Sequence, residues 1–277
     1  MWVGHFSMII VIIIWYTFIL SNITLFSRLY LGSQHSTPAY IPILKDLDRF
    51  LKLSPEQKHH CVLRTDAGFG SDANLDYALD EDWHILSKGG GGRRPFALAR
   101  QVAPDDWLDL GKDSWIAPSV QSPAYVRPVR HWVLRWLTPH QQIKYATLVC
   151  SVMEWSAQET AAYYDDRGAC ETEIRSDKSG LKLCKRRKHS LAAQEALVLL
   201  TDLAHNVLAW NAHIMFPEGP LAAFGTTRLI EDVLAIPGHL IIREGRLVEV
   251  QLNQNHPHAE TTAAGLERLL KHYGHSE

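Results

Sequence analysis

The sequence predicts a mixed α/β fold, and three observations support this class. Short apolar runs at residues 61–65 and 145–150 contain β-branched residues and are typical of buried strands. Segments with apolar residues at helical spacing, such as residues 41–51, accompany these runs. The composition, 46% hydrophobic and 21% charged, suits a sizeable core and excludes disordered, collagen-like and coiled-coil chains. A chain of 277 residues is long enough for one large domain or one domain with an insertion.

An apolar leader occupies residues 1–35. Residues 6–27 carry no charge, and about 20 apolar residues are enough for a helix to cross a bilayer. The leader lacks a basic start and an A-x-A site, so a cleaved signal peptide is not expected. Two interpretations remain. Either residues 6–27 form a transmembrane helix that anchors the protein, or the leader is sequence read into the front of a gene that has lost its proper start.

The first predicted elements after the leader surround a glycine-rich turn. Apolar residues at helical spacing predict a short helix over residues 41–51. The predicted strand at residues 61–65 runs into Asp66-Ala67-Gly68-Phe69-Gly70, whose glycines allow a tight turn. Ser71 is a suitable N-cap for a helix over residues 72–81.

A β-rich insertion is predicted in the middle of the chain. A short strand at residues 84–87 leads into residues 89–94, a basic Gly-rich loop that lacks the G-K-[ST] of a nucleotide-binding loop. From about residue 89 to 143, Pro, Trp, β-branched residues and turn signals favour antiparallel strands over helices. Another buried strand is expected at residues 144–153.

The second half of the chain is expected to be mostly helical. Ser156 and Glu159 form an S-x-x-E capping box that opens a long helix. A second long helix is predicted over residues 191–215, a β-hairpin over 238–252, and a last amphipathic helix over 260–273.

Positive charge is concentrated in two tracts, although the chain as a whole is nearly neutral. The 28 Lys and Arg residues and 30 Asp and Glu residues give a net charge of −2. Residues 114–153 contain no acidic residue, and neither do residues 178–189. Any affinity for nucleic acid must therefore come from the distribution of charge rather than its total.

The cysteines and histidines do not suggest a metal site. Cys61, Cys150, Cys170 and Cys184 form no C-x-x-C pair and no zinc-type spacing, so we expect free thiols in a reducing compartment. The fifteen histidines fall in no H-E-x-x-H frame and are expected at the surface or in the core.

The helix that Ser156 opens carries the clearest functional pattern. Tyr164, Arg167, Glu171 and Lys178 follow the spacing Y-x2-R-x3-E-x6-K. At about 100° per residue these side chains share one stripe of the helix, which we expect to be exposed. A salt-bridged surface helix is the simpler explanation, but chance gives this spacing in about one chain in a thousand. The pattern resembles the Y-R-E-K signature of insertion-sequence DDE transposases.

A second motif agrees with this resemblance. The segment Arg64-Thr65-Asp66-Ala67-Gly68-Phe69 is similar to the R-x-D-x-G-aromatic segment that holds the family's second catalytic aspartate. The resemblance implies an α/β fold: an incomplete ribonuclease H-like fold with a β-rich insertion between the second and third acidic residues. We expect this core over residues 36–215, with the insertion at about 89–143. A C-terminal hairpin and helix extension is expected over residues 216–277.

The resemblance also implies a chemistry. Phosphoryl transfer of this kind uses two divalent ions, Mg²⁺ or Mn²⁺, about 3.5–4 Å apart. Asp66 and Glu171 would be catalytic metal ligands, while Tyr164, Arg167 and Lys178 would contact phosphates of the transposon end. The implied partners are transposon-end and target DNA and a second copy in a synaptic complex. A cytoplasmic, nucleoid-associated protein is expected, with a membrane as partner only if the leader is a true transmembrane helix.

The family's first aspartate has no counterpart in the sequence. It belongs on the first strand of the sheet, well upstream of the second, yet no Asp or Glu precedes Asp46. Asp46 and Asp48 are the candidate substitutes. We therefore expect a copy that is truncated at its N-terminus and catalytically impaired. Two other classes stay open: a non-catalytic DNA-binding remnant that interferes with a full-length transposase, and a membrane-anchored protein of unknown role.

Basic residues directly after the signature are expected to contact DNA. They are Lys182, Lys185, Arg186, Arg187 and Lys188. A solvated surface is the alternative, but a neighbouring phosphate-binding stripe favours contact with the DNA backbone. In the insertion, Trp132, Trp136 and Arg135 could pack on the transposon end, although most tryptophans are expected in the core.

Overall fold

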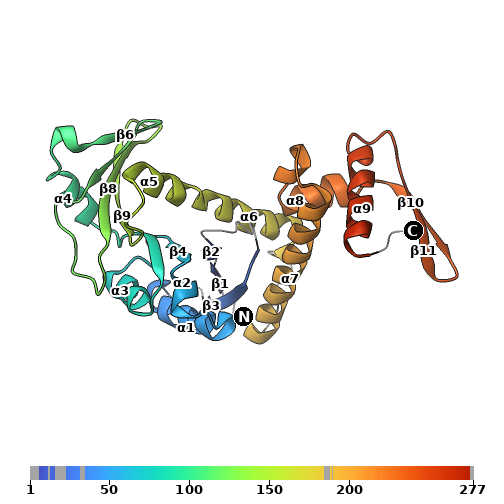
Figure 1. Ribbon diagram of the computed structural model, residues 1–277, viewed down its shortest axis with the longest axis horizontal. Helices are drawn as coiled ribbons and strands as arrows, with labels where there is room; N and C mark the ends of the chain where they lie inside the picture. Colours follow the sequence, from blue (N-terminus) through green and yellow to red (C-terminus); the bar gives the residue numbers. More distant parts are fainter. Residues whose placement is uncertain are drawn as a thin grey trace. The chain divides into compact units, whose positions relative to one another are not determined.

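A computed structural model of the chain describes residues 6–11, 13–15, 23–31, 35–183, 188 and 190–274 (Figure 1). The chain forms two compact units. The first comprises residues 1–21 and 28–168, and the second comprises residues 22–27 and 169–277. The boundaries expected at residues 35 and 215 stay a prediction, because compactness alone does not test them.

A seven-stranded mixed sheet forms the centre of the first unit, in the order β2-β4-β5-β9-β8-β7-β6. Strands β4 and β5 are parallel, and the other neighbouring pairs are antiparallel. The strands span Ile13–Trp15 (β2), Cys61–Thr65 (β4), His84–Lys88 (β5), Leu108–Gly111 (β6), Ser114–Pro118 (β7), Arg130–Leu137 (β8) and Ile143–Cys150 (β9). The predicted α/β class is therefore confirmed.

The insertion between β5 and β9 adds strands to one side of the sheet. Strands β6, β7 and β8 are antiparallel, as the sequence predicts, and β8 pairs with β9 along its whole length. The expectation of strands without helices is wrong for α4, Arg94–Ala99, and for the 3₁₀ turn η2, Pro104–Asp106. Pro95 suits the first turn of a helix, and Leu98 of α4 packs into a small buried cluster with strand residues.

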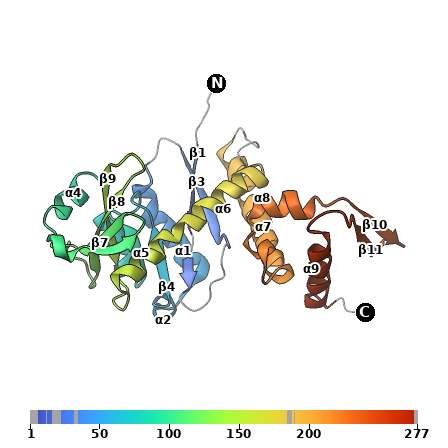
Figure 2. The same cartoon turned by 90° about the horizontal axis from the view of Figure 1, so that it is seen from above.

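Helices cover both faces of this sheet. Helix α5, Ala157–Asp165, lies against one face, and Figure 2 shows it crossing the strands. Val62, Leu86 and Leu148 point to this face and join a buried cluster with α5. Side chains alternate along a strand, so Leu63 and Ile85 are buried on the opposite face, on the side of α1, Tyr40–Leu51, and α3, Asp72–Asp80.

Local capping signals determine where the helices begin. Ser71 accepts a hydrogen bond from the backbone N–H of Asn74 and caps α3. Ser156 and Glu159 form the reciprocal capping box at the start of α5. Hydrogen bonds from the backbone and hydroxyl of Ser156 also lower the pKa of Glu159. Both predicted caps are confirmed. The four-residue helix α2, Pro55–Lys58, has a capping box of its own at Ser54.

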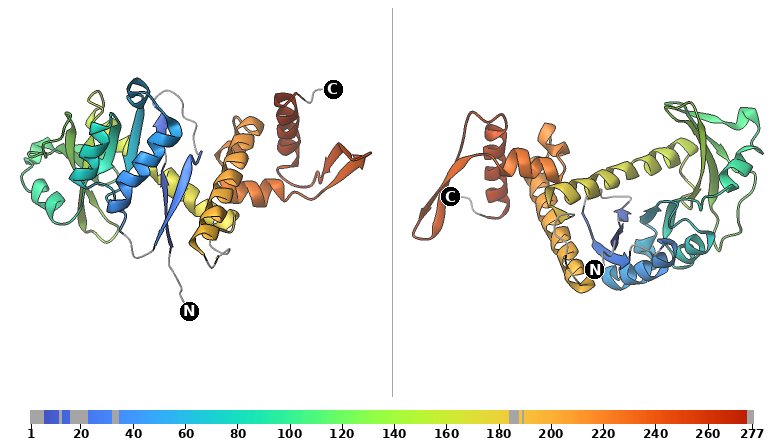
Figure 3. Two further views of the ribbon diagram at one scale, coloured as in Figure 1. Left: turned by 90° about the horizontal axis from the view of Figure 1, so that it is seen from below. Right: turned by 180° about the vertical axis from the view of Figure 1, so that it is seen from behind.

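The second unit is mostly helical. It contains α6 (Arg167–Gly180) from residue 169 onward, α7 (Leu191–Met215), η4 (Pro220–Ala223), α8 (Thr226–Arg228), the π-helix η5 (Leu229–Leu234), β10 (Gly238–Arg243), β11 (Arg246–Leu252) and α9 (Ala259–His272). The long helix, the hairpin and the last helix agree with the sequence prediction. Figure 3 shows the β10–β11 hairpin projecting beside α9.

Close packing joins α9 to the end of α7. Gly265 of α9 leaves no room for a side chain, because an added Cβ would lie 2.9 Å from the ring of Phe216 and 3.1 Å from Met215. Met215 and Phe216 belong to a buried cluster with Leu221, Leu229 and Val233. The C-terminal extension is thus packed on the end of α7.

The described part of the apolar leader forms strands. Strands β1, Phe6–Val11, and β3, Phe26–Leu31, form a two-stranded sheet, and β2 pairs antiparallel with β4. The transmembrane-helix interpretation of residues 6–27 therefore does not match these segments, because their Ile- and Val-rich sequence suits extended backbone. Within the described residues, no helix is long and apolar enough to cross a membrane.

The structure describes the thiols of two of the four cysteines. Cys61 and Cys150 are buried free thiols, and burial raises the pKa of each to about 11. Cys184 and the side chain of Cys170 lie outside the described residues.

Candidate functional site

Asp66 lies in a rigid turn at the carboxyl end of β4. Its Oδ1 accepts a hydrogen bond of 2.9 Å from the backbone N–H of Gly68, and its carbonyl accepts one of 3.1 Å from Phe69. The carbonyl of Gly68 accepts hydrogen bonds from the hydroxyls of Ser36 (3.0 Å) and Thr37 (2.8 Å). Asp66 is exposed, and within the described residues its Oδ2 accepts no hydrogen bond. One carboxylate oxygen is therefore held in place while the other faces solvent.

A glycine allows this turn to lie against the end of the neighbouring strand. A Cβ on Gly70 would lie 1.9 Å from the carbonyl oxygen of Lys88, so no other residue fits there without a backbone shift. The carbonyl of Gly70 accepts a hydrogen bond of 2.6 Å from the backbone N–H of Gly90. The Asp66 turn is thus locked to the loop that follows β5.

Arg64, two residues before Asp66, ties β4 to the end of α5. Its guanidinium donates a hydrogen bond to the carbonyl of Tyr163, and it forms an ion pair of 3.3 Å with Asp166. Only 8% of the Arg64 side chain is exposed. This role of Arg64 was not predicted from the sequence, although Arg64 lies two residues after Val62 on β4 and so shares the face that α5 covers. The strand that positions Asp66 is therefore connected directly to the helix that begins the signature.

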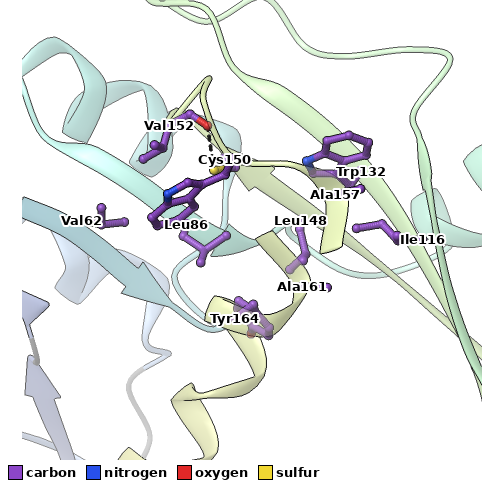
Figure 4. Close-up of a cluster of buried hydrophobic side chains, with 11 residues drawn as sticks. Val62, Leu86, Ile116, Trp132, Leu148, Cys150, Val152, Ala157, Ala161 and Tyr164 are labelled. Carbon is purple, nitrogen blue, oxygen red and sulfur yellow. Dashed lines mark hydrogen bonds between the residues drawn. The ribbon is translucent and has the colours of Figure 1, made fainter. Parts of the chain in front are cut away.

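Tyr164 is buried rather than exposed. It is 7% exposed and packs with Val62, Leu86 and Leu148, as Figure 4 shows. The prediction that all four signature side chains share an exposed stripe is therefore wrong for Tyr164. The physical reason is that residues 157, 160, 161 and 164 recur at helical spacing and form the face of α5 that packs on the sheet. Contact of Tyr164 with DNA stays a prediction.

The other signature residues lie on α6. The side chains of Arg167 and Glu171 lie outside the described residues, as do Lys185, Arg186 and Arg187. Lys178, Lys182 and Lys188 are described, and all three are exposed. The expected closeness of Asp66 and Glu171 stays a prediction.

Buried polar groups fix the end of α6 within the second unit. The Asp177 carboxylate accepts hydrogen bonds of 2.8 Å from His205 Nδ1 on α7 and of 2.8 Å from the Thr226 hydroxyl. All three residues are buried. A Cβ on Gly180 would lie 2.9 Å from the Cα of Thr227, so the backbones approach closely there. Lys178, next to Asp177, therefore projects from a well-anchored part of the helix.

The candidate substitutes for the first acid are both engaged in ion pairs. Asp46 pairs with Arg28 at 3.0 Å and with Arg49 at 2.8 Å, and Asp48 pairs with Lys58 at 2.8 Å. These contacts anchor α1 within the first unit. Among the residues whose side chains are described, no group of three or more His, Cys, Asp or Glu could hold a metal ion. The residues covered by this statement include Asp66 but not Glu171, whose side chain lies outside the described residues.

Comparison with known families decides the identity. Residues 121–273 match the family described as "Transposase DDE domain group 1", over more than half of the chain. The chain belongs to this family of DDE transposases. The match begins after Asp66 and includes β8, β9, the helices with the signature and the C-terminal extension. A comparison with curated proteins gave no match.

Proposed function

We propose that this DDE transposase belongs to an insertion sequence and binds transposon-end and target DNA. The family match is the observation that carries the proposal. The placement of Asp66 supports it, because ligands of α/β sheets bind at the carboxyl ends of parallel strands. Asp66 stands at that end of β4, and Arg64 links this strand to the end of α5, the helix that carries Tyr164 of the signature.

Asp66 and Glu171 are the residues we propose as metal ligands. Asp66 fits this role, since it offers an exposed carboxylate oxygen of the kind that Mg²⁺ or Mn²⁺ prefers, on a turn that hydrogen bonds hold rigid. When bound, divalent ions in such sites activate the attacking oxygen and stabilise the leaving oxygen of the DNA strand. Glu171 enters the proposal through the signature spacing alone.

Cationic side chains near the signature are the proposed DNA contacts. Lys178, Lys182 and Lys188 are exposed, which is the condition for an ammonium group to reach a phosphate. We assign the same role to Arg167, Lys185, Arg186 and Arg187 from their place in the sequence. A second copy of the chain is the proposed partner in a synaptic complex.

Catalytic impairment is part of the proposal. Two carboxylates, those of Asp66 and Glu171, leave a divalent pair with fewer acidic ligands than the three that the family uses. The ion pairs of Asp46 and Asp48 argue against either as a replacement. A non-catalytic DNA-binding protein that interferes with an active transposase is therefore the second candidate function.

Binding to DNA is the first experiment. The purified chain is titrated onto a mixed-sequence DNA duplex at several salt concentrations. We expect binding that weakens as salt rises, because Lys and Arg contacts with phosphates release counterions. The variant Arg49→Gln is the control for a general loss of positive charge. Because Arg49 is already paired with Asp46, this variant should bind DNA with the salt dependence of the wild type. Absence of binding even at low salt would refute the proposed function.

A further inference from the structure

Helix α7 exposes large apolar side chains and buries polar ones, the reverse of a helix that packs only within its own domain. Its buried residues include Gln194, Thr201 and His205. Its large apolar side chains with 43–63% exposure are Leu191, Leu199, Leu200, Leu203, Val207 and Trp210. Contiguous exposed apolar surface of this kind marks a place where another protein binds.

Most of these exposed side chains follow a heptad repeat. Seven residues of α7 are separated alternately by three and four positions: Ala193, Ala196, Leu200, Leu203, Val207, Trp210 and Ile214. Ile214 is half-buried and the other six are exposed. This spacing is the a/d seam of helices that pack side by side, and it runs for about 32 Å at 1.5 Å per residue. A second helix is therefore the partner that fits the seam.

The sizes of the side chains suit a second copy of α7 that runs in the opposite direction. In an antiparallel pair in which Leu203 faces the partner's Val207, Leu200 faces the partner's Trp210. In the same register Ala196 faces the partner's Ile214. Each layer then combines a smaller side chain with a larger one, as well-packed helix pairs do. A parallel pair would instead place two Trp210 rings in one layer and two alanines in another.

Charge and area both permit this pairing. Helix α7 contains no Lys or Arg, and its acidic residues are Glu195 and Asp202. At 100° per residue both acids lie roughly 100° or more from the centre of the seam, so two copies meet without like charges in contact. The exposed apolar side chains along the seam present roughly 600 Å² on each copy, about the least that a specific interface takes from one partner.

We propose that the exposed seam of α7, residues 193–214, is the interface of a dimer of this chain. The two helices pack antiparallel about a two-fold axis, so each copy contributes the same surface. The inference rests on the proposed function for its role, since it assigns a surface to the second copy in the synaptic complex. The dimer itself forms without DNA, because the seam is apolar and offers no cation to a phosphate.

The molar mass in solution, measured without DNA, tests the interface. Light scattering should give twice the 31.4 kDa of one chain for the wild type. Leu203→Glu places two carboxylates in the middle of the seam and should halve this mass, with an unchanged circular dichroism spectrum. Leu191→Glu is the matched control. It makes the same change at an exposed leucine of the same helix, outside the seam, and should leave the dimer intact.

Disulfide crosslinking tests the antiparallel register without a disruptive charge. An equimolar mixture of Leu200→Cys and Trp210→Cys chains should give a crosslinked dimer on mild oxidation, above the background of the wild-type cysteines. Either variant alone should stay at that background, because its two cysteines would lie about 15 Å apart along the helix pair. Crosslinking of Leu200→Cys with itself instead would indicate a parallel pair and overturn the register. This measurement also decides the matter if Leu203→Glu fails to fold.

The outcomes separate this interface from the proposed function. A wild type with the mass of one chain at all concentrations, or a folded Leu203→Glu with the mass of the dimer, would overturn the interface. Salt-dependent binding of the wild type to the DNA duplex would then still support the proposed function. A dimer that dissociates in Leu203→Glu but binds no DNA at low salt would confirm the interface and refute the proposed function.

Discussion

Arg64 and Asp166 form an ion pair across 102 residues of sequence, with 3.3 Å between Nη1 and Oδ2. The same guanidinium donates to the carbonyl of Tyr163, so it fixes the end of α5 against the strand that leads into Asp66. The R-x-D-x-G-F motif thus joins a structural arginine to the candidate metal ligand. Loss of Arg64 is expected to affect both stability and the position of Asp66.

Replacing Arg64 with Ala should lower the free energy of unfolding by about 1–3 kcal/mol, because it removes the donor to a carbonyl and a nearly buried charge. Asp166→Ala is the matched control. Asp166 is 70% exposed, so loss of the surface ion pair alone should cost less than about 1 kcal/mol. Chemical denaturation measures both values. Equal losses in the two variants would show that the ion pair matters rather than the hydrogen bond to Tyr163.

Two glycines near Asp66 should respond in opposite ways to an added methyl group. Gly70→Ala would place a Cβ 1.9 Å from the carbonyl oxygen of Lys88, a clash between backbones that only a shift of the turn can relieve. We expect it to cost more than about 1 kcal/mol, as overpacking does elsewhere. Gly91→Ala meets open space and should be neutral to within about 0.5 kcal/mol. Thermal unfolding of both variants checks this, and a neutral Gly70→Ala would contradict the packing of the turn.

Features with a local signal could be predicted from the sequence. The caps at Ser71 and Ser156 are examples, because an N-cap hydroxyl serves the first turn of its own helix whatever packs around it. The β10–β11 hairpin is another, since Glu244 and Gly245 both adopt the positive φ that such a turn needs.

Features that depend on long-range packing could not be predicted. The Y-R-E-K spacing is periodic on the helix but does not say which face meets the sheet, so Tyr164 was expected at the surface and is buried. The pairing of Arg64 with the end of α5 depends on how the helix packs on the sheet, which joins residues about 100 positions apart in the chain. Helix α4 was missed because its short sequence lies in a region rich in turn and strand signals.

The chain should show no Mg²⁺- or Mn²⁺-dependent cleavage of transposon-end DNA. Two carboxylates hold a divalent pair poorly, and Asp46 and Asp48 are engaged with Arg28, Arg49 and Lys58. A nicking assay on transposon-end DNA with either metal measures this. Robust cleavage that disappears in Asp66→Ala would refute the expected impairment. The search for a third ligand would then start from Asp46→Asn and Asp48→Asn.

The basic residues after the signature should account for much of the electrostatic part of DNA binding. Replacing Lys185, Arg186, Arg187 and Lys188 together with Ala should flatten the salt slope by up to about four contacts, or about 3.6. Lys178→Ala should flatten it by about 0.9. Binding to one duplex across a salt series provides the measurement. An unchanged slope in the quadruple variant would show that these residues form only a solvated surface.

Asp202 should make the stability of the protein depend on pH. Burial raises the pKa of its carboxyl from the ordinary 3.8 to about 6, with a further rise from Asp177 opposed by the Ser27 hydroxyl and by His205. A carboxyl whose pKa is raised on folding binds its proton more tightly in the folded state, so stability is lost as pH rises from about 4 through about 6. The Oδ2 atom is buried without a hydrogen bond among the described residues, which explains why the charged form is disfavoured.

The variant Asp202→Asn isolates this effect. It keeps an oxygen to accept the 3.1 Å hydrogen bond from Ser27 but cannot ionise. We expect it to unfold at a temperature close to that of the wild type at pH 4 and at a higher temperature at pH 7. Thermal unfolding of both proteins at intervals from pH 4 to pH 7 gives the difference curve, in which the titrations of groups remote from Asp202 largely cancel. A difference that is flat with pH would show that folding does not raise the pKa of Asp202, and one that increasingly favours the wild type toward pH 7 would show that the folded state stabilises the charged carboxylate.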